Sequence, residues 1–491
     1  MLLLSFPDEI LVRVFVELDG YGLMRSQEVC VSFRKIVTDD IRLQYKLKLY
    51  ASSMIDRPHS FTSMPISERL STLNSFLAAR GSWTHAWPEG MVKQADLNVL
   101  PGGGGFVYRS KMLVGWLDLQ TIVSLKFLNR NSPFPYSKRV FHPHAVDNSR
   151  GLLFDPTQAL LVLMGESLKQ GGGRDYGVHI RSLSNGGHHP RAQQSFISTS
   201  AWIHEFGYSA EINDELIAIS GHGFGDGSTR AFVVLNWLTG NVEWNSELPH
   251  GPVTFLDKKH FLIGTKNIHT NRIELRVYAQ GRQEPLLVFP FPELESSIIL
   301  PSGLRLNITH NYTRSPNAPT AEVSHLPFGT DVSKRVLALT MWVDGEMGSE
   351  RRIYTIFPAS AIISFITDSP RPCREIPWGD WPQCTISMPL GKPKISVYGS
   401  RVAILRSNLF SRIGTISVYD LNERWFAKQM RTEVTSFGRY FKASLWEHAI
   451  QTIPLPQPEQ VFQSADLEEF WMDEDMLIAS KRGPSVEYVR L

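Results

Sequence analysis

A recurring pair of short apolar segments makes up most of this sequence, and it is the feature that most limits the possible folds. Each unit has an apolar segment, a polar or glycine-rich turn and a second apolar segment, as in VAILR followed by TISVYDL. The spacing runs from 45 residues (216 to 261) to 75 residues (261 to 336), enough for a four-stranded sheet with loop insertions. The first segments of the seven units begin at Met112, Leu160, Leu216, Phe261, Val336, Val402 and Met476.

We expect these units to form a seven-bladed β-propeller over residues 91–491, in which four-stranded sheets succeed one another around a ring. The last unit runs to Leu491 and leaves no residues for an outer strand. A strand from the start of the region, within residues 97–107, would supply that strand and close the ring. Because the units share a pattern and no strict motif, a pair of β-sandwiches stays open as the alternative architecture.

Residues 1–90 have the periodicity of helices. In SFPDEILVRVFVELDG, residues 5–20, Pro7 and two acidic residues favour a helix start, because a first turn leaves its amide hydrogens unpaired. Apolar residues then gather on one side of about three turns, and Gly20 is expected to end the helix. A helix this short is marginal unless that side is buried. The predicted fold class is therefore α+β multidomain, with an all-α region followed by an all-β propeller.

The charge balance excludes a general attraction to nucleic acid or to anionic membranes. The chain has 50 Lys and Arg residues against 48 Asp and Glu residues, a formal net charge of +2. Three cysteines are too few for a secreted disulfide framework, and no apolar run reaches the length of a membrane span. The opening MLLLSF lacks the basic segment of a signal peptide, so we expect a cytosolic or nuclear protein.

The first 45 residues contain an ordered set of apolar and polar positions: Phe6-Pro7-x-Glu9-Ile10-Leu11, then Val29-Cys30, then Phe33-Arg34. This set resembles an F-box, whose pattern opens with Leu-Pro-x-Glu-Ile-Leu and continues to Val-Cys and an aromatic residue. Two positions depart from it, since Phe6 replaces the usual leucine and Gly22 stands where an acidic residue is common. The following segments, LQYKLKLYASSMID and SERLSTLNSFLAARGSWTHAW, resemble the connection to a β-rich domain in a group of fungal F-box proteins.

The F-box resemblance implies a partner and a role. F-box motifs pack on the Skp-type adaptor of cullin-based ubiquitin ligases, and a separate domain binds the protein substrate. The resemblance divides the chain into an F-box (1–45), a helical linker (46–90) and a propeller-like substrate-binding domain (91–491). The residues that it assigns to adaptor binding are Leu4, Phe6, Pro7, Ile10, Leu11, Val14, Phe15, Leu18, Leu23, Val29, Cys30 and Phe33.

No sequence pattern points to catalysis, a metal or a cofactor. GHGFGDGS, residues 221–228, precedes a second strand, whereas a phosphate-binding glycine loop opens a helix, so we expect a hairpin loop. The histidines are scattered over predicted loops without metal-ligand spacing, and neither a nucleophile elbow nor a P-loop is present. We therefore expect that the chain is not itself an enzyme and that it binds neither a cofactor nor a metal.

The leading hypothesis is a substrate-recognition subunit of a Skp–cullin–F-box ubiquitin ligase whose protein target is unknown. Target binding is expected on propeller loops, with candidates in residues 280–333, 367–400 and 427–470. A propeller enzyme or ligand-binding protein with a helical cap is the alternative, and a scaffold that binds the adaptor without ubiquitin transfer is a third. Packing between blades is the expected role of the tryptophans Trp342, Trp378, Trp381, Trp425, Trp446 and Trp471.

Overall fold

Two compact units make up the chain, and each is described by itself. The helical unit comprises Met1–His85 with Thr320–Val332, and the strand-rich unit comprises Ala86–Pro319 with Ser333–Arg490. The computed structural model describes residues 6–56, 64–81, 92–93, 98–99, 106–112, 121–128, 136–141, 147–155, 158–168, 174–182, 185–199, 208–221, 232–246, 251–267, 272–291, 305–306, 327–331, 334–344, 350–366, 373–381, 384–388, 394–407, 413–421, 460–465, 467–472, 476–481 and 485–490.

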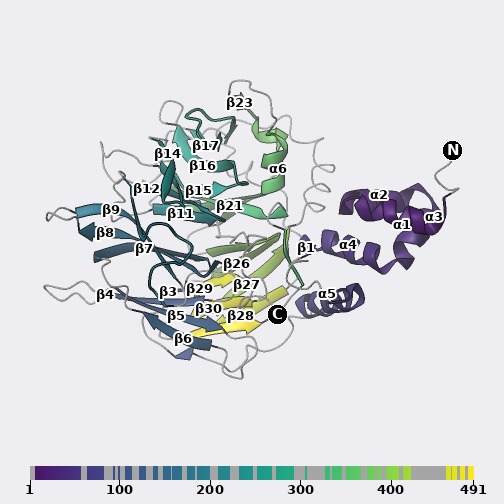
Figure 1. Cartoon of the computed structure of the whole chain (residues 1–491), viewed down its shortest axis with the longest axis horizontal. Coiled ribbons are helices and arrows are strands. Elements are labelled where there is room, and N and C mark those ends of the chain that lie inside the picture. Colours follow the sequence, from purple (N-terminus) through teal and green to yellow (C-terminus); the bar gives the residue numbers. More distant parts are fainter. Residues whose placement is uncertain are drawn as a thin grey trace. The chain divides into compact units, whose positions relative to one another are not determined.

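Five helices and a small two-stranded sheet form the described part of the helical unit (Figure 1). The helices are α1 (Asp8–Glu17), α2 (Gly20–Val29), α3 (Val31–Asp39), α4 (Ile41–Ala51) and α5 (Ile66–Gly81), and the sheet pairs β1 (Met54–Asp56) with β20 (Phe328–Thr330). Side chains at the junctions cap the helices. The Asp19 carboxylate accepts a hydrogen bond from the Gly22 amide at 2.7 Å, and the Asp40 carboxylate accepts one from the Arg42 amide at 2.9 Å.

Gly20 is the first residue of α2, so the expectation that it ends the first helix is wrong. The first helix ends at Glu17, where Leu18 is already extended. A β-carbon at Gly20 would lie 2.2 Å from side-chain atoms of Tyr50 in α4. Glycine is needed here because α2 and α4 approach closely, and the sequence alone did not separate that reason from a helix end.

Two apolar clusters hold the helical unit together, and α4 contributes to both. The first cluster joins α1, α2, α3 and α4 through Leu11, Val12, Phe15, Leu23, Phe33, Ile36, Val37 and Leu43. The second joins α4, α5, β1 and β20 through Tyr45, Leu49, Met54, Leu70, Leu73 and Phe328. Because α4 carries residues of both clusters, the helices before and after it form one continuous packed unit.

The strand-rich unit contains seven antiparallel sheets that follow one another in chain order within the described residues. Sheet 1 is β3 (Asn98–Val99), β4 (Phe106–Met112), β5 (Thr121–Leu128) and β6 (Tyr136–Phe141); sheet 2 is β7 (Asp147–Asp155), β8 (Leu160–Leu168), β9 (Arg174–Ser182) and β10 (Phe196–Ser198); sheet 3 is β11 (Tyr208–Asn213), β12 (Leu216–Gly221), β13 (Phe232–Asn236) and β14 (Asn241–Ser246).

The remaining sheets continue the series. Sheet 4 is β15 (Val253–Phe255), β16 (His260–Asn267), β17 (Arg272–Ala279) and β18 (Leu287–Pro290), with a fifth, parallel strand β23 (Arg374–Glu375). Sheet 5 is β19 (Arg305–Leu306), β21 (Val336–Asp344), β22 (Glu350–Pro358) and β24 (Cys384–Met388); sheet 6 is β25 (Lys394–Tyr398), β26 (Arg401–Ser407), β27 (Ile413–Asp420) and β28 (Gln460–Ala465); sheet 7 is β29 (Leu467–Met472), β30 (Met476–Lys481), β31 (Ser485–Arg490) and β2 (Val92–Lys93). A short helix, α6 (Ala359–Ser364), and a 3-10 turn, η6 (Trp378–Asp380), follow β22.

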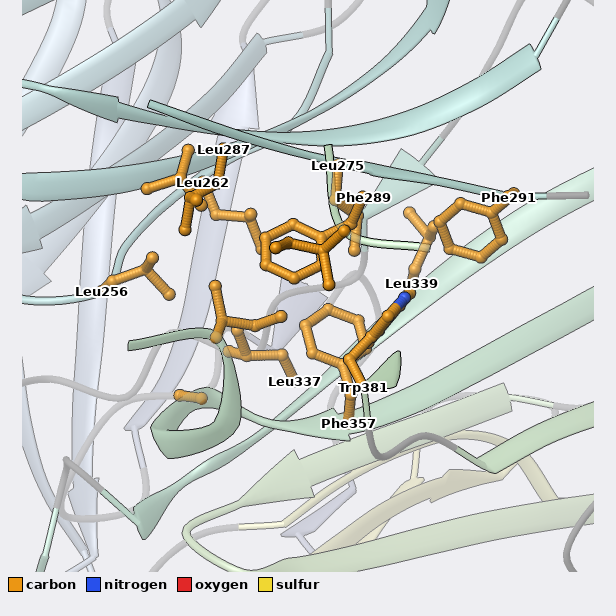
Figure 2. Close-up of a cluster of buried hydrophobic side chains, with 14 of the residues drawn as sticks. Leu256, Leu262, Leu275, Leu287, Phe289, Phe291, Leu337, Leu339, Phe357 and Trp381 are labelled. Carbon is orange, nitrogen blue, oxygen red and sulfur yellow. The ribbon is translucent and has the colours of Figure 1, made fainter. Parts of the chain in front are cut away.

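Neighbouring sheets pack face to face through apolar side chains. Separate clusters join sheets 2 and 3, sheets 3 and 4, sheets 4 and 5, and sheets 5 and 6. Figure 2 shows the cluster between sheets 4 and 5, in which the Trp381 ring lies 5.4 Å from each of the Phe289 and Phe357 rings. Sheets buried on both faces explain why many strands read as continuous apolar runs. Successive four-stranded sheets packed in this way are characteristic of a β-propeller.

The predicted order of a helical region followed by a propeller-like region is confirmed in this coarser form. Six of the seven first segments begin within one residue of a strand start, at β8, β12, β16, β21, β26 and β30. The remaining prediction, for the first unit, is wrong, because Met112 ends β4 and does not begin a strand. A strand from the start of the region does join the last sheet, but it is Val92–Lys93 on β31, whereas the expected region 97–107 contributes to sheet 1.

Other predictions on this unit have mixed outcomes. The strands that flank GHGFGDGS, β12 and β13, are antiparallel neighbours, as expected for a hairpin, and residues 222–231 lie outside the described residues. Trp381 packs between sheets, and Trp378 lies partly buried beside it. The other four tryptophan side chains lie outside the described part. The segments proposed as loop insertions contain strands, including β18, β24, β28 and β29.

A buried ion pair connects three of the sheets. The Arg335 guanidinium lies 3.4 Å from the carboxylate of Glu211 in β11 and 3.4 Å from the hydroxyl of Thr254 in β15. The second carboxylate oxygen of Glu211 accepts the Phe255 amide at 2.8 Å. Arg335 directly precedes β21, and all three side chains are buried. The pair thus fixes the start of β21 against sheets 3 and 4.

Arg335→Met is expected to lower the free energy of unfolding of the strand-rich unit by about 3 to 5 kcal/mol, because it leaves the buried Glu211 carboxylate without its cation. Lys258→Met is the matched control, since Lys258 is mostly exposed where it pairs with Asp214 and its loss should cost about 1 kcal/mol or less. Urea unfolding followed by tryptophan fluorescence measures both. Equal effects of the two substitutions would contradict the structural role of Arg335.

Candidate protein-binding surface

Helix α1 has a buried apolar side and an exposed apolar side. Leu11 and Phe15 point into the first cluster of the helical unit, where the Phe15 ring lies 5.0 Å from the Phe33 ring in an edge-to-face arrangement at 82°. Phe6, Ile10 and Val14 recur every four residues and retain 42%, 41% and 46% of their surface exposed. Ile10 and Val14 lie one turn apart on the same side of α1, and Phe6 is exposed just before the helix begins; we call these three residues the stripe.

Polar residues border this stripe. Glu9, Arg13 and Glu17 are exposed on the same turns of α1, and Pro7 is exposed next to Phe6. An apolar centre with a charged border is the usual composition of a protein-binding surface. The two acidic residues of the first turn, Asp8 and Glu9, also lie at the positive end of the helix and favour its formation there.

A second group of exposed apolar side chains lies on α2 and at the junction between α2 and α3. Val29 and Val31 have 69% and 79% of their surface exposed, the highest values among the large apolar residues that the structure describes, and Tyr21 is also exposed. Cys30 between the valines is partly buried, and its sulfur accepts the Phe33 amide at the start of α3. Helices α2 and α3 pack against each other (Figure 1). Both valines are therefore displayed by a helix junction that buries the cysteine between them.

The structure divides the residues predicted to bind an adaptor into an outer set and an inner set. Phe6, Pro7, Ile10, Val14 and Val29 are exposed; Leu11, Phe15, Leu23 and Phe33 are buried in the first cluster; Leu18 and Cys30 are partly buried against it; Leu4 lies outside the described residues. The inner set shapes and supports the helices, and the outer set is accessible to another molecule.

Sequence reasoning missed Tyr21 and Val31. The helical periodicity of residues 1–90 did not show which side of each helix is covered. The sequence pattern that could have indicated Val31 is the Val-Cys-Val run at the junction of two helices. Three consecutive side chains cannot all point into the core, so at least one of these apolar residues must be exposed. The stripe, Tyr21 and the exposed pair on either side of Cys30 define the candidate surface: Phe6, Ile10, Val14, Tyr21, Val29 and Val31.

Among the described residues we also looked for metal-binding groups, membrane-spanning helices and buried histidines. None of them groups three or more His, Cys, Asp or Glu side chains in an arrangement that could hold a metal ion. None of the described helices is long and apolar enough to cross a membrane. In the strand-rich unit, the ring of His189 is buried, and burial holds its pKa below the usual value for histidine. Both ring nitrogens form hydrogen bonds with backbone groups, the Gln158 carbonyl and the Arg191 amide. These bonds hold the ring within the fold.

Phe15→Ala is expected to destabilise α1–α3 by about 3 to 5 kcal/mol, because it empties space in a packed cluster. Ile10→Ala should change the stability by less than about 0.5 kcal/mol, since Ile10 lies on the outer side of the same helix. Hydrogen exchange of peptides from residues 8–39, measured by mass spectrometry on the full chain, reports the local opening free energy. A large loss of protection in Ile10→Ala would show that the stripe is part of the core.

No protein-family model matches the sequence, and no curated protein is similar to it. Among solved structures, the chain is similar to the β-propeller domain of the trilobed protease from Pyrococcus furiosus, at 11% identity and a TM-score of 0.38 over 79% of this chain and 92% of that one. It is similar to hydrazine synthase from Kuenenia stuttgartiensis, at 9% identity and a TM-score of 0.40 over 83% and 99%. Prolyl oligopeptidase B from Galerina marginata is similar at 10% identity and a TM-score of 0.38, over 79% of this chain and 46% of that one.

These comparisons correct one prediction. The statement that the chain is not an enzyme is contradicted, because several of the similar structures belong to peptidases, including an acylaminoacyl peptidase from Pyrococcus horikoshii. The likenesses do not assign peptidase activity to this chain, since identities of 9 to 11% and TM-scores below 0.5 carry no argument about chemistry.

Proposed function

We propose that the helical unit docks a Skp-type adaptor of a cullin-based ubiquitin ligase and that the strand-rich unit binds a protein target, so that the chain acts as a substrate receptor in the cytoplasm or nucleus. The observation that carries the proposal is the exposed apolar stripe of α1, Phe6, Ile10 and Val14. It lies within the stretch whose order of residues resembles an F-box.

The energetics favour a partner that covers more than this stripe. Its three side chains expose a little under half of their surface, so covering them contributes on the order of 2 to 4 kcal/mol, from roughly 1.5 to 3 kcal/mol for complete burial of each. Association itself costs at least about as much. A stable complex therefore also needs the exposed Tyr21, Val29 and Val31 and the charged border of α1.

For the strand-rich unit, we propose that the seven sheets are the seven blades of a β-propeller. The pairing of β2 with β31 would close the ring of blades. Val92 pairs with Val486 and Lys93 with Ser485, which adds the earliest strand of the unit to its last sheet. Pairing of this kind ties the first strand of the unit to its last sheet by backbone hydrogen bonds. The rims of such a ring present loops, the usual place for target recognition.

The test is a double variant of the full chain, Ile10→Glu with Val14→Glu. It is co-expressed with an affinity-tagged Skp adaptor, and the amount of chain that co-purifies with the adaptor is measured. Two carboxylates on the stripe would have to be desolvated in an apolar contact, so co-purification should fall to background. Ile55→Glu is the matched control, because Ile55 on β1 has 46% of its surface exposed, as Val14 has, and lies outside the stripe. Phe15 is avoided because its replacement would destabilise the helices themselves.

Three outcomes decide between the hypotheses. Loss of the adaptor in the double variant and its retention in Ile55→Glu support docking through α1. Unchanged adaptor binding in the double variant, or no binding by the unaltered chain, contradicts the proposal. Binding of the adaptor without recovery of a cullin in the same complex contradicts the ligase role and favours the scaffold.

A further inference from the structure

Strand β1 is a short strand in the helical unit, and its partner comes from a remote part of the sequence. Met54, Ile55 and Asp56 pair antiparallel with Thr330, Gly329 and Phe328, and the Asp331 amide donates to the Ser53 carbonyl at 2.9 Å. In sequence, β20 falls between β19 and β21 of sheet 5. The chain thus leaves the strand-rich unit at Pro319, contributes a strand to the helical unit, and returns at Ser333.

Apolar side chains of α4 and α5 surround the aromatic side chain of this strand, and we call this set of side chains the α4–α5 pocket. Phe328 is almost fully buried among Tyr45, Leu49, Leu70 and Leu73. Its ring also meets the Phe76 ring at 5.3 Å and 62°. An extended segment that adds to a free strand edge and inserts one side chain into a pocket is a recurring mode of peptide recognition, in which the main chain gives affinity and the pocket gives specificity.

Side chains of α4 and α5 also contact β1, besides its pairing with β20. The Tyr45 hydroxyl donates to the Asp56 carboxylate at 3.0 Å, and the Arg69 guanidinium forms an ion pair with the same carboxylate at 3.0 Å. Arg69 also donates from Nε to the Met64 carbonyl at 3.0 Å. Burial, and then the Asp56 charge, raises the pKa of Tyr45, so its hydroxyl stays protonated and keeps donating. The strand that β20 pairs with is therefore also bonded to α4 and α5 through its Asp56 side chain.

The segment is anchored at its other end as well. Only residues 332–334 separate Asp331, which bonds to β1, from Arg335, whose ion pair with Glu211 is buried in the strand-rich unit. One short stretch of chain is thus fixed in each of the two units by independent interactions.

We propose that the β1 edge and the α4–α5 pocket form a strand-addition site whose ligand is residues 327–331 of the same chain, and that this segment is a clasp joining the helical unit to the strand-rich unit. The clasp is a second connection besides residues 82–91. It is independent of whether an adaptor binds the helical unit.

The experiment places a site for a sequence-specific protease within residues 82–91 of the full chain and cuts it after purification. If β20 is a clasp, the N-terminal fragment should stay with the remainder in gel filtration. Phe328→Ala should release it, because the pocket loses its aromatic ligand, and Phe328→Leu should restore part of the retention. Phe291→Ala is the matched control, since Phe291 is equally buried but packs within the strand-rich unit.

A second measurement needs no substitution at Phe328. Hydrogen exchange of peptides that contain residues 54–56 and 327–331 is compared in cut and uncut protein, and both peptides should stay protected after cutting. Release of the N-terminal fragment from the unaltered protein, its retention in a folded Phe328→Ala variant, or loss of protection in both peptides after cutting would each overturn the inference. These readouts involve no adaptor, so their failure leaves the proposed function standing.

Discussion

The packing of Leu11 and Phe15 against Leu23 and Phe33 decides what the helical unit can present to another molecule. These side chains form the cluster that orients α1, and so determine which of its two apolar sides stays outside. The exposed stripe follows from this choice, because Ile10 and Val14 lie next to the buried residues along the same helix. A shift of one residue in the register would turn the helix by about 100° and bring other side chains to its outer side. The proposed docking through α1 therefore depends on the interior of the unit as much as on the stripe.

Much of the secondary structure could be predicted from local patterns. Continuous apolar runs marked the strands correctly because the sheets are covered on both faces, so every position in a strand such as β12 from Leu216 to Ser220 is buried. Pro7 and the acidic residues after it marked the start of α1. The approximate strand order within each sheet followed from simple chain succession, which antiparallel hairpins favour. These successes share a cause, since each depends on neighbours in the sequence.

The failures concern residues whose environment is made by remote segments. Gly20 looked like a helix end, but the nearby Tyr50 ring is what requires glycine. The twelve predicted contact residues could not be sorted by periodicity, because α1 is apolar on both sides and only packing separates Ile10 from Leu11. Phe328 stands in HLPFGT, a short stretch with no strand signal, and its partner strand lies in the first part of the chain. Pairing of this kind is invisible to any local window.

The extra strand of sheet 4 has a consequence for how the strand-rich unit meets other molecules. β23 runs parallel to β18 and takes up its outer hydrogen-bonding edge at Leu287 and Val288, with the Ile376 amide donating to the Val288 carbonyl at 2.8 Å. An occupied edge cannot recruit a strand from a neighbouring molecule. The edge of sheet 4 therefore passes from β18 to β23, which has only two residues, and so short an edge offers few backbone groups to a strand from another molecule.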